Sequence, residues 1–291
     1  MSALDALLHG LIDYAGLFPP AQLAMPYAVR NHAAYLAGPH GGKLGRFIVP
    51  VARLEEFEAA HAALDPDNQH EWRLSVLAGA DPKADLNTIL SFNARQADAR
   101  IVSIETKATA PADIAKAAAF PPVFEVWVEL PVNKDVGANL AALKSIGRGA
   151  KLRTGGVTPD AFPSLSDVAA FLAACRDHGL VAKATAGLHH PLRGEFALTY
   201  AAGAPRGTMF GFLNVFLAAA LLHHGGNIAD ATALLSDGDP RQFTCTPDAL
   251  AWRNHQFSRP QLESTRRQLL RSFGSCSFTE PIEGLQELRW L

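Results

Sequence analysis

Cysteine is scarce in this chain, and the few cysteines stand far apart. The 291 residues include three of them, Cys175, Cys245 and Cys276, and no CxxC pair. An odd number of widely spaced cysteines argues against a disulfide framework, and it argues equally against a structural zinc site. We therefore expect a reducing, cytoplasmic environment.

The chain also lacks an excess of charge of either sign. Its 26 Lys and Arg residues and 28 Asp and Glu residues give a formal net charge of -2, with a sequence pI of about 6.6. No basic field is available to hold a nucleic acid backbone or an anionic membrane surface. The sequence therefore predicts a small-molecule partner, with no nucleic acid and no membrane.

Long hydrophobic runs are missing as well. The longest apolar stretch, residues 210–222, carries Asn214 and is shorter than the roughly 20 residues that a membrane span needs. The N-terminus has no basic cluster before its apolar residues, unlike a secretory signal. Hydrophobic residues make up 48% and charged residues 19% of the chain, a composition typical of a soluble globular protein.

What the sequence does have is a repeating alternation of short β-like runs and Ala/Leu-rich helical stretches. This alternation is typical of a parallel sheet covered by helices. Six β-like runs are clear, at residues 47–51, 73–78, 101–106, 126–130, 150–154 and 181–186. Helical patterns follow five of them, at residues 54–64, 84–94, 111–119, 136–146 and 166–178. Chains of this length can form one α/β barrel, so the sequence predicts a TIM-type (β/α)8 barrel in a single domain, 1–291.

The two remaining strands of the predicted barrel have weaker signals. Residues 209–214 are the candidate for a seventh strand, and residues 11–17 for an eighth. We expect the barrel core at residues 46–225, after an N-terminal loop and helix segment at 1–45. A helical extension is expected at 226–291; it would be helical over 245–272 and then form a loop and a short helix. This last part would be a cap or a contact in a homo-oligomer.

Two lysines with matching surroundings stand at the ends of predicted strands. Lys151 lies in Ala-Lys-Leu-Arg-Thr-Gly-Gly and Lys183 in Ala-Lys-Ala-Thr-Ala-Gly-Leu-His-His. In a βα barrel, side chains at the C-terminal ends of the strands converge on one mouth, where active sites lie. Arg153 shares a strand face with Lys151. Repulsion between these two cations is expected to lower the pKa of the lysine and to make it a nucleophile.

Two glutamates, Glu105 and Glu129, lie inside apolar, β-branched runs. A charge in such a run is costly without a partner, so each carboxylate should meet a cation or a metal ion. Structural pairing with Lys151 or Lys183 would account for both glutamates, and proton transfer in catalysis is the alternative. Arg153 would then hold the carboxylate or phosphate of a substrate.

Adjacent histidines, His189 and His190, follow a predicted turn after the strand that carries Lys183. Either histidine could reach the mouth of the barrel and contact a substrate. Together with Glu105 and Glu129 they form an alternative ligand set for a divalent metal ion. A surface or capping role is the simpler interpretation of both.

Glycines and an N-terminal loop complete the candidate residues for substrate binding. Gly155, Gly156 and Gly187 follow strands, where backbone N–H groups could approach a phosphate, although such glycines also serve as turns. Asp13 and Tyr14 belong to an aromatic, proline-rich loop. This loop either lines the site or plugs the base of the barrel.

From residue 126 to residue 187 the chain resembles the class I deoxyribose-phosphate aldolases and their barrel relatives. In that family a Lys-x-x-Thr-Gly strand bears the Schiff-base lysine, and a later Lys-Ala-x-Gly-Gly strand bears a second lysine that tunes the first. Here Lys151-Leu-Arg-Thr-Gly155 and Lys183-Ala-Thr-Ala-Gly187 follow in that order. The resemblance implies an imine on Lys151, with Lys183 tuning it. Glu105 stands in the run where the family has a proton-transferring aspartate.

These observations favour an enzyme that forms or breaks a bond next to a carbonyl group in a small anionic substrate. Lys151 would form the imine without any other cofactor, and Glu105 or Glu129 would move the proton. One alternative is a metal-dependent lyase, isomerase or hydrolase that uses the Glu and His ligands. The other is a noncatalytic barrel that binds an anion through its lysines and arginine.

Overall fold

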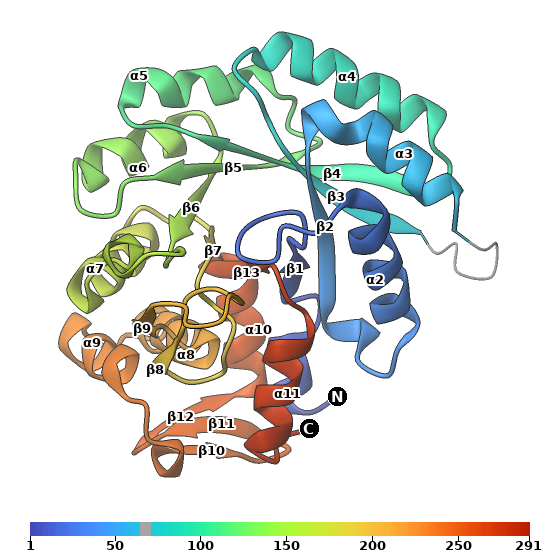
Figure 1. Cartoon of the computed structure of the whole chain (residues 1–291). Helices are drawn as coiled ribbons and strands as arrows, with labels where there is room; N and C mark the ends of the chain where they lie inside the picture. Colours follow the sequence, from blue (N-terminus) through green and yellow to red (C-terminus); the bar gives the residue numbers. More distant parts are fainter. Residues whose placement is uncertain (65–70) are drawn as a thin grey trace.

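The strands that follow the predicted alternation close into a barrel (Figure 1). The computed structural model describes residues 1–64 and 71–291, and within them eight parallel strands pair in the order β1-β13-β7-β6-β5-β4-β3-β2. The strands are β1 (Ile12–Tyr14), β2 (Leu44–Pro50), β3 (Trp72–Leu77), β4 (Ala99–Lys107), β5 (Glu125–Leu130), β6 (Gly149–Arg153), β7 (Ala182–Thr185) and β13 (Leu270–Ser275). The predicted TIM-type α/β barrel is confirmed.

Helices surround this barrel and connect its strands (Figure 1). They are α1 (Ala3–Leu8), α2 (Met25–Ala37), α3 (Leu54–Ala62), α4 (Pro82–Arg95), α5 (Pro111–Ile114), α6 (Val136–Ser145), α7 (Leu165–Asp177), α8 (Phe212–His223), α9 (Ile228–Ser236), α10 (Arg259–Gln268) and α11 (Thr279–Glu287). Short 3-10 turns are η1 (Gly41–Lys43), η2 (Val51–Arg53), η4 (Ala115–Ala119), η5 (Pro159–Ala161) and η6 (Pro240–Gln242). In the described ranges no helix is both long and apolar enough to cross a membrane.

Local sequence signals explain where several helices begin. Ser164 caps α7 by accepting a hydrogen bond from the backbone N–H of Asp167 at 3.1 Å, and Gly179 follows the helix with a φ of 60°. Asp81 caps α4 in the same way, with Pro82 in the first turn. A capping oxygen satisfies a backbone donor that the helix itself leaves free, so these boundaries can be derived from the sequence.

The predicted strand at residues 209–214 is wrong. Met209 ends β9 (Arg206–Met209), which pairs with β8 (Gly194–Ala197) in a separate antiparallel hairpin. The apolar run after it forms α8, which is buried from Phe212 to Leu222. A continuous apolar run has no periodicity to separate strand from buried helix, and here its length was the better guide.

The barrel strand that takes this place is β13, which lies outside the expected core of residues 46–225, as does β1. The expected helix over 245–272 is also wrong. That region holds α10 and parts of β10 (Phe243–Cys245) and β13, and between them β11 (Ala249–Trp252) and β12 (His255–Ser258). The strands β10 to β12 form a small antiparallel sheet. The expected strand at 11–17 is confirmed by β1, and the short terminal helix by α11.

The two faces of the barrel strands differ in chemistry. Side chains that face the helices are apolar and buried, as Phe47 on β2 and Val128 on β5 show. Side chains at the alternate positions face the barrel axis, and many of them are polar although buried: Asp13, Arg46, Ser75, Ser103, Glu105, Glu129, Lys151, Lys183 and Ser272. Interiors of such barrels are commonly filled by bulky branched apolar residues. The polar interior is therefore the feature of this fold that requires an explanation.

Candidate active site

Lys151 and Lys183 lie side by side inside the barrel. They are directly paired in the register of β6 and β7. Both ammonium groups bind the carboxylate of Glu105, one on each oxygen. Lys183 Nζ lies 2.6 Å from Oε1, and Lys151 Nζ lies 2.8 Å from Oε2. The expectation of neighbouring strand ends therefore holds for the geometry of this pair.

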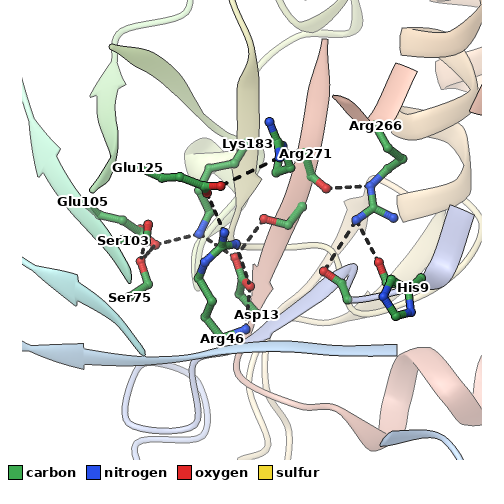
Figure 2. A network of polar contacts seen from close by, with 12 residues as sticks. His9, Asp13, Arg46, Ser75, Ser103, Glu105, Glu125, Lys183, Arg266 and Arg271 are labelled. Atoms are coloured by element: carbon green, nitrogen blue, oxygen red, sulfur yellow. Dashed lines mark hydrogen bonds and ion pairs between the residues drawn. The ribbon is translucent and has the colours of Figure 1, made fainter. Parts of the chain in front are cut away.

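Lys183 is fully buried, and its second partner is Asp13 on β1. Its Nζ lies 2.7 Å from Asp13 Oδ2, an oxygen that also accepts a hydrogen bond from the Ser272 hydroxyl at 2.8 Å. The backbone N–H of Arg46 donates to the other oxygen of Asp13 at 2.8 Å. Figure 2 shows Lys183 reaching toward both carboxylates from its strand. Asp13 and Glu105 therefore hold the Lys183 ammonium from two sides.

Lys151 has Glu129 as its second partner, at 3.0 Å from Oε2. Arg153 approaches the same carboxylate and donates from Nε to Oε1 at 2.9 Å. The Lys151 side chain is 7% exposed, whereas that of Arg153 is 49% exposed. Glu129 thus links a buried ammonium to a guanidinium that reaches solvent.

These contacts form one chain of alternating charge across the barrel. It contains four cations and three carboxylates and runs in the order Arg46, Asp13, Lys183, Glu105, Lys151, Glu129, Arg153. Each carboxylate lies between two cations, which offsets the cost of removing it from water. We call these seven residues the charge network.

The carboxyl groups of the charge network are held ionised. Burial alone raises the pKa of Asp13, Glu105 and Glu129, but the neighbouring cations outweigh it and keep all three pKa values below their usual range. For Lys151, burial acts downward, yet the charges of Glu105 and Glu129 outweigh it and the pKa is raised. The expected lowering of the Lys151 pKa by Arg153 is therefore wrong, because Glu129 binds both cations and offsets their repulsion.

A cavity of about 250 Å³ opens over the charge network. Its lining residues come from the C-terminal ends of the strands and the loops after them: Ala15, Phe18, Pro19, Ile48, Leu77, Glu105, Lys151, Arg153, Gly156, Val157, Thr185, Ala186, His189, Gly274 and Cys276. Lys151 and Glu105 therefore meet the cavity, whereas Lys183 lies outside its lining. Arg153 joins Lys151 as a cationic side chain in the cavity lining.

The three candidate glycines have different positions. Gly156 lines the cavity. Gly155 and Gly187 instead allow two loops to pack closely, since a Cβ on either would lie within 3.0 Å of the Phe162 ring. Gly187 also has a φ of 71°, which a residue with a side chain rarely adopts. Close packing therefore explains these two glycines without a phosphate.

The N-terminal loop lines the cavity, but not through Tyr14. The Tyr14 ring faces the surrounding helices, where it packs edge-on against Tyr35 with centroids 5.4 Å apart. Burial raises the pKa of Tyr14 to about 12. Ala15, Phe18 and Pro19 reach the cavity from the same loop. Asp13 takes part in the charge network beneath it, so a role for this loop at the site rests on other residues than Tyr14.

The adjacent histidines, His189 and His190, lie in different surroundings. His189 lines the cavity, and its Nδ1 lies 2.9 Å from Glu280 Oε2. His190 lies outside the lining and stacks on Phe196 with ring centroids 3.5 Å apart, and burial lowers its pKa to about 4. Over residues 1–64 and 71–291, no group of three or more His, Cys, Asp or Glu side chains is arranged to hold a metal ion. The alternative ligand set of these histidines with Glu105 and Glu129 is therefore not brought together.

Sequence reasoning missed several polar residues of the site or its surroundings. Arg46 lies near the start of β2, away from the C-terminal strand ends, and Thr185 is a common type of strand residue. Cys276 and Glu280 follow β13, a strand that the sequence did not reveal. A correct assignment of β13 would have pointed to both.

Comparison with known proteins adds little to this geometry. No protein-family model matches the chain, and no curated protein matches it. Among solved structures, a lysine/ornithine decarboxylase from Vibrio vulnificus, crystallised with cadaverine, is similar at 14% sequence identity and a TM-score of 0.40. The match covers 63% of this chain and 48% of that one, so the matched part is about half of the decarboxylase. Likeness at this level does not bear on the site, and the resemblance to class I aldolases stays an expectation from residues 126–187.

Proposed function

We propose that this chain is an enzyme that forms or breaks a bond next to the carbonyl group of a small anionic substrate, with Lys151 as the amine that forms an imine. The observation that carries the proposal is the position of Lys151, which meets the cavity while its ammonium lies between Glu105 and Glu129. The cavity lies at the C-terminal ends of the barrel strands, where this fold carries out its chemistry.

The contacts favour Lys151 over Lys183 as the nucleophile. An amine must lose its proton before it can attack a carbonyl carbon. When Lys151 does so, Glu105 keeps Lys183 as a partner and Glu129 keeps Arg153. Loss of the Lys183 proton would be more costly. Asp13 would lose a cation at 2.7 Å, and its remaining cation in the charge network, Arg46, lies farther away at 3.7 Å. Lys151 is the more dispensable of the two charges.

The raised pKa of Lys151 has two opposite effects on imine chemistry. It keeps the resting amine protonated near pH 7, which slows the attack. An iminium nitrogen, however, carries the same positive charge in the same place, so Glu105 and Glu129 would stabilise it once formed. We assign these carboxylates to charge stabilisation, since their lowered pKa values make them weak bases.

Arg153 supplies the second part of the proposal, recognition of an anion. Its guanidinium binds Glu129 with Nε, is about half exposed and lines the cavity. A guanidinium can hold a carboxylate or phosphate through two parallel hydrogen bonds. Lys151 and Arg153 together would accept a small carbonyl compound that carries an anionic group.

Reductive trapping tests the imine directly. The protein is incubated with a panel of 2-oxo acids and phosphorylated aldehydes and ketones, reduced with borohydride and examined by peptide mass spectrometry. We expect an adduct on Lys151 that disappears in Lys151→Met. Lys116→Met is the matched control, because the Lys116 side chain is 66% exposed, and it should leave the adduct unchanged. Absence of an adduct with every compound that the protein turns over would refute imine chemistry.

The raised pKa of Lys151 favours one second candidate, in which the lysine stays charged and stabilises a developing oxyanion without a covalent bond. The same trapping experiment separates the two. In this second case, turnover would occur without an adduct, and Lys151→Arg would retain part of the activity because it keeps the charge. Under imine chemistry, Lys151→Arg would be inactive.

A further inference from the structure

A second polar cluster reaches the cavity from parts of the chain outside the charge network. It contains His189 from the loop after β7, Tyr200 from the turn between β8 and β9, and Glu280 from the first turn of α11. Glu280 Oε2 lies 2.9 Å from His189 Nδ1 and accepts a hydrogen bond from the Tyr200 hydroxyl at 3.1 Å. One carboxylate oxygen therefore binds both side chains.

The Glu280 carboxyl group is ionised in this arrangement. Burial alone raises its pKa, but the hydrogen bond and charge of His189 and the hydrogen bond of Tyr200 outweigh burial and lower it. Its place in the first turn of a nine-residue helix favours a negative charge further. An ionised carboxylate can only accept hydrogen bonds, so the ring nitrogen of His189 that faces it must be the donor.

The hydrogen bond to Glu280 decides which nitrogen of His189 can act as a base. With the proton on Nδ1, the other ring nitrogen, Nε2, has a free lone pair in the neutral ring. The His189 side chain is 9% exposed and lines the same cavity as Lys151. A carboxylate that fixes the orientation and tautomer of a histidine is how enzymes prepare an imidazole for proton transfer.

We propose that His189 is the residue that moves the proton at the carbon next to the reacting carbonyl, and that Glu280 and Tyr200 position it. The proposal rests on the imine proposed for Lys151. Nε2 takes a proton from the carbon beside the iminium carbon, and the electron pair of the broken C–H bond forms a C=C bond. The C=N electron pair moves onto nitrogen and neutralises the iminium. Reversal returns the proton to the carbon, so the step needs no further reactant.

The surrounding cluster supports this role for His189 over the nearby thiol. Cys276 also lines the cavity, with its sulfur 3.7 Å from the Tyr200 hydroxyl. Burial raises the pKa of its thiol to about 11, so it is neither an effective base nor a thiolate nucleophile at neutral pH. Among the cavity-lining residues that the structure describes, His189 is the imidazole prepared to accept a proton.

Isotope exchange measures the proposed step apart from imine formation. Each compound of the carbonyl panel, pyruvate included, is incubated with the protein in D2O, and loss of the C–H signal beside the carbonyl is followed by NMR. His189→Gln should slow the exchange by at least about 100-fold, the usual contribution of a positioned base, while borohydride trapping on Lys151 persists. His190→Gln is the matched control, since His190 lies outside the cavity lining, and it should exchange at the wild-type rate.

Glu280→Gln tests the positioning role with a readout that a merely structural residue would not change. Loss of the carboxylate removes the group that holds the proton on Nδ1 of His189. The exchange should therefore slow while borohydride trapping on Lys151 persists, and the conservative variant Glu280→Asp should restore part of the exchange. Exchange by His189→Gln within about 3-fold of wild type, or no exchange by the wild-type protein with any compound, would overturn the role of His189. Persistent trapping on Lys151 in either case would leave the proposed imine standing. Exchange that is lost in His189→Gln without any trapping in the wild type would refute the imine alone.

Discussion

Replacing Lys183 with methionine should destabilise the fold more than the same replacement of Lys151. Lys183 is fully buried, and its Nζ lies 2.7 Å from Asp13 and 2.6 Å from Glu105. Without it, Asp13 keeps hydrogen bonds from Ser272 and a backbone N–H, but its remaining cation is Arg46 at 3.7 Å. Removing one partner of a buried ion pair costs about 3–5 kcal/mol, because it leaves an uncompensated buried charge.

Lys151→Met should have a smaller effect, since its two carboxylates share their other cations. Glu105 keeps Lys183 at 2.6 Å, and Glu129 keeps Arg153 at 2.9 Å. The loss is then closer to that of a buried group deprived of one hydrogen-bond partner, about 1–3 kcal/mol. The two variants remove the same side chain from neighbouring strands, so the difference between them reports the partners and not the volume.

Urea unfolding at pH 7 measures both free energies. An unfolding entropy of about 2.1 cal/mol/K per residue gives a Tm shift of roughly 5–8 °C for the larger loss in a chain of this length. Adding Asp13→Asn to Lys183→Met should recover part of the stability. It removes the unpaired charge, and the amide oxygen can still accept the Arg46 N–H. Equal losses for Lys183→Met and Lys151→Met would refute the reasoning, as would a double variant less stable than Lys183→Met.

Three further predictions concern other parts of the molecule. Arg153→Met should raise the KM for an anionic carbonyl substrate about 10-fold or more with a smaller change in kcat, as steady-state kinetics would show, because it removes binding that is common to ground state and transition state. Gly149→Ala should cost about 1–3 kcal/mol in urea unfolding through overpacking, since its Cβ would lie 2.4 Å from the Trp127 ring. His32 is fully buried, and burial lowers its pKa to about 3, below the value of about 6.5 in an unfolded chain. Its contribution to stability is therefore complete above about pH 6.5 and is lost as the pH falls toward 3, and His32→Phe should flatten this dependence in unfolding titrations between pH 6.5 and 4.

The sequence predicted most of the barrel strands from short β-like runs, five of which are followed by helical patterns. Residues 126–130, 150–154 and 181–186 are short β-like runs that fall on β5, β6 and β7. β13 was not recognised because Leu270–Ser275 contains an arginine, a glycine and two serines, a composition typical of a loop. Its Ser272 and Gly274 face the barrel axis, where a hydrogen bond to Asp13 and the cavity require small residues. The small and polar residues that the barrel interior requires thus replaced the apolar residues by which a strand is recognised in a sequence.

The same limits apply to the site. The lysine pair could be found because both residues stand at matching points of two regular strands, and a parallel sheet brings such points together. Glu280 was not found, since the strand before it, β13, was not recognised and its link to His189 spans 91 residues. The direction of the Lys151 pKa shift was missed for a similar reason. Arg153 is near in sequence, but the carboxylates that decide the shift come from β4 and β5.

Barrel closure and the charge network depend on each other. Asp13 and Lys183 are 170 residues apart in the chain. They meet because β13 pairs with both β1 and β7. Before β1 and β13 are in place, Lys183 has Glu105 as a partner but lacks Asp13, and Asp13 lacks both Lys183 and Ser272. Partly closed barrels would therefore bury charges without their partners, which is costly. The network that holds the Lys151 ammonium between Glu105 and Glu129 thus also favours the closed barrel over partly assembled states.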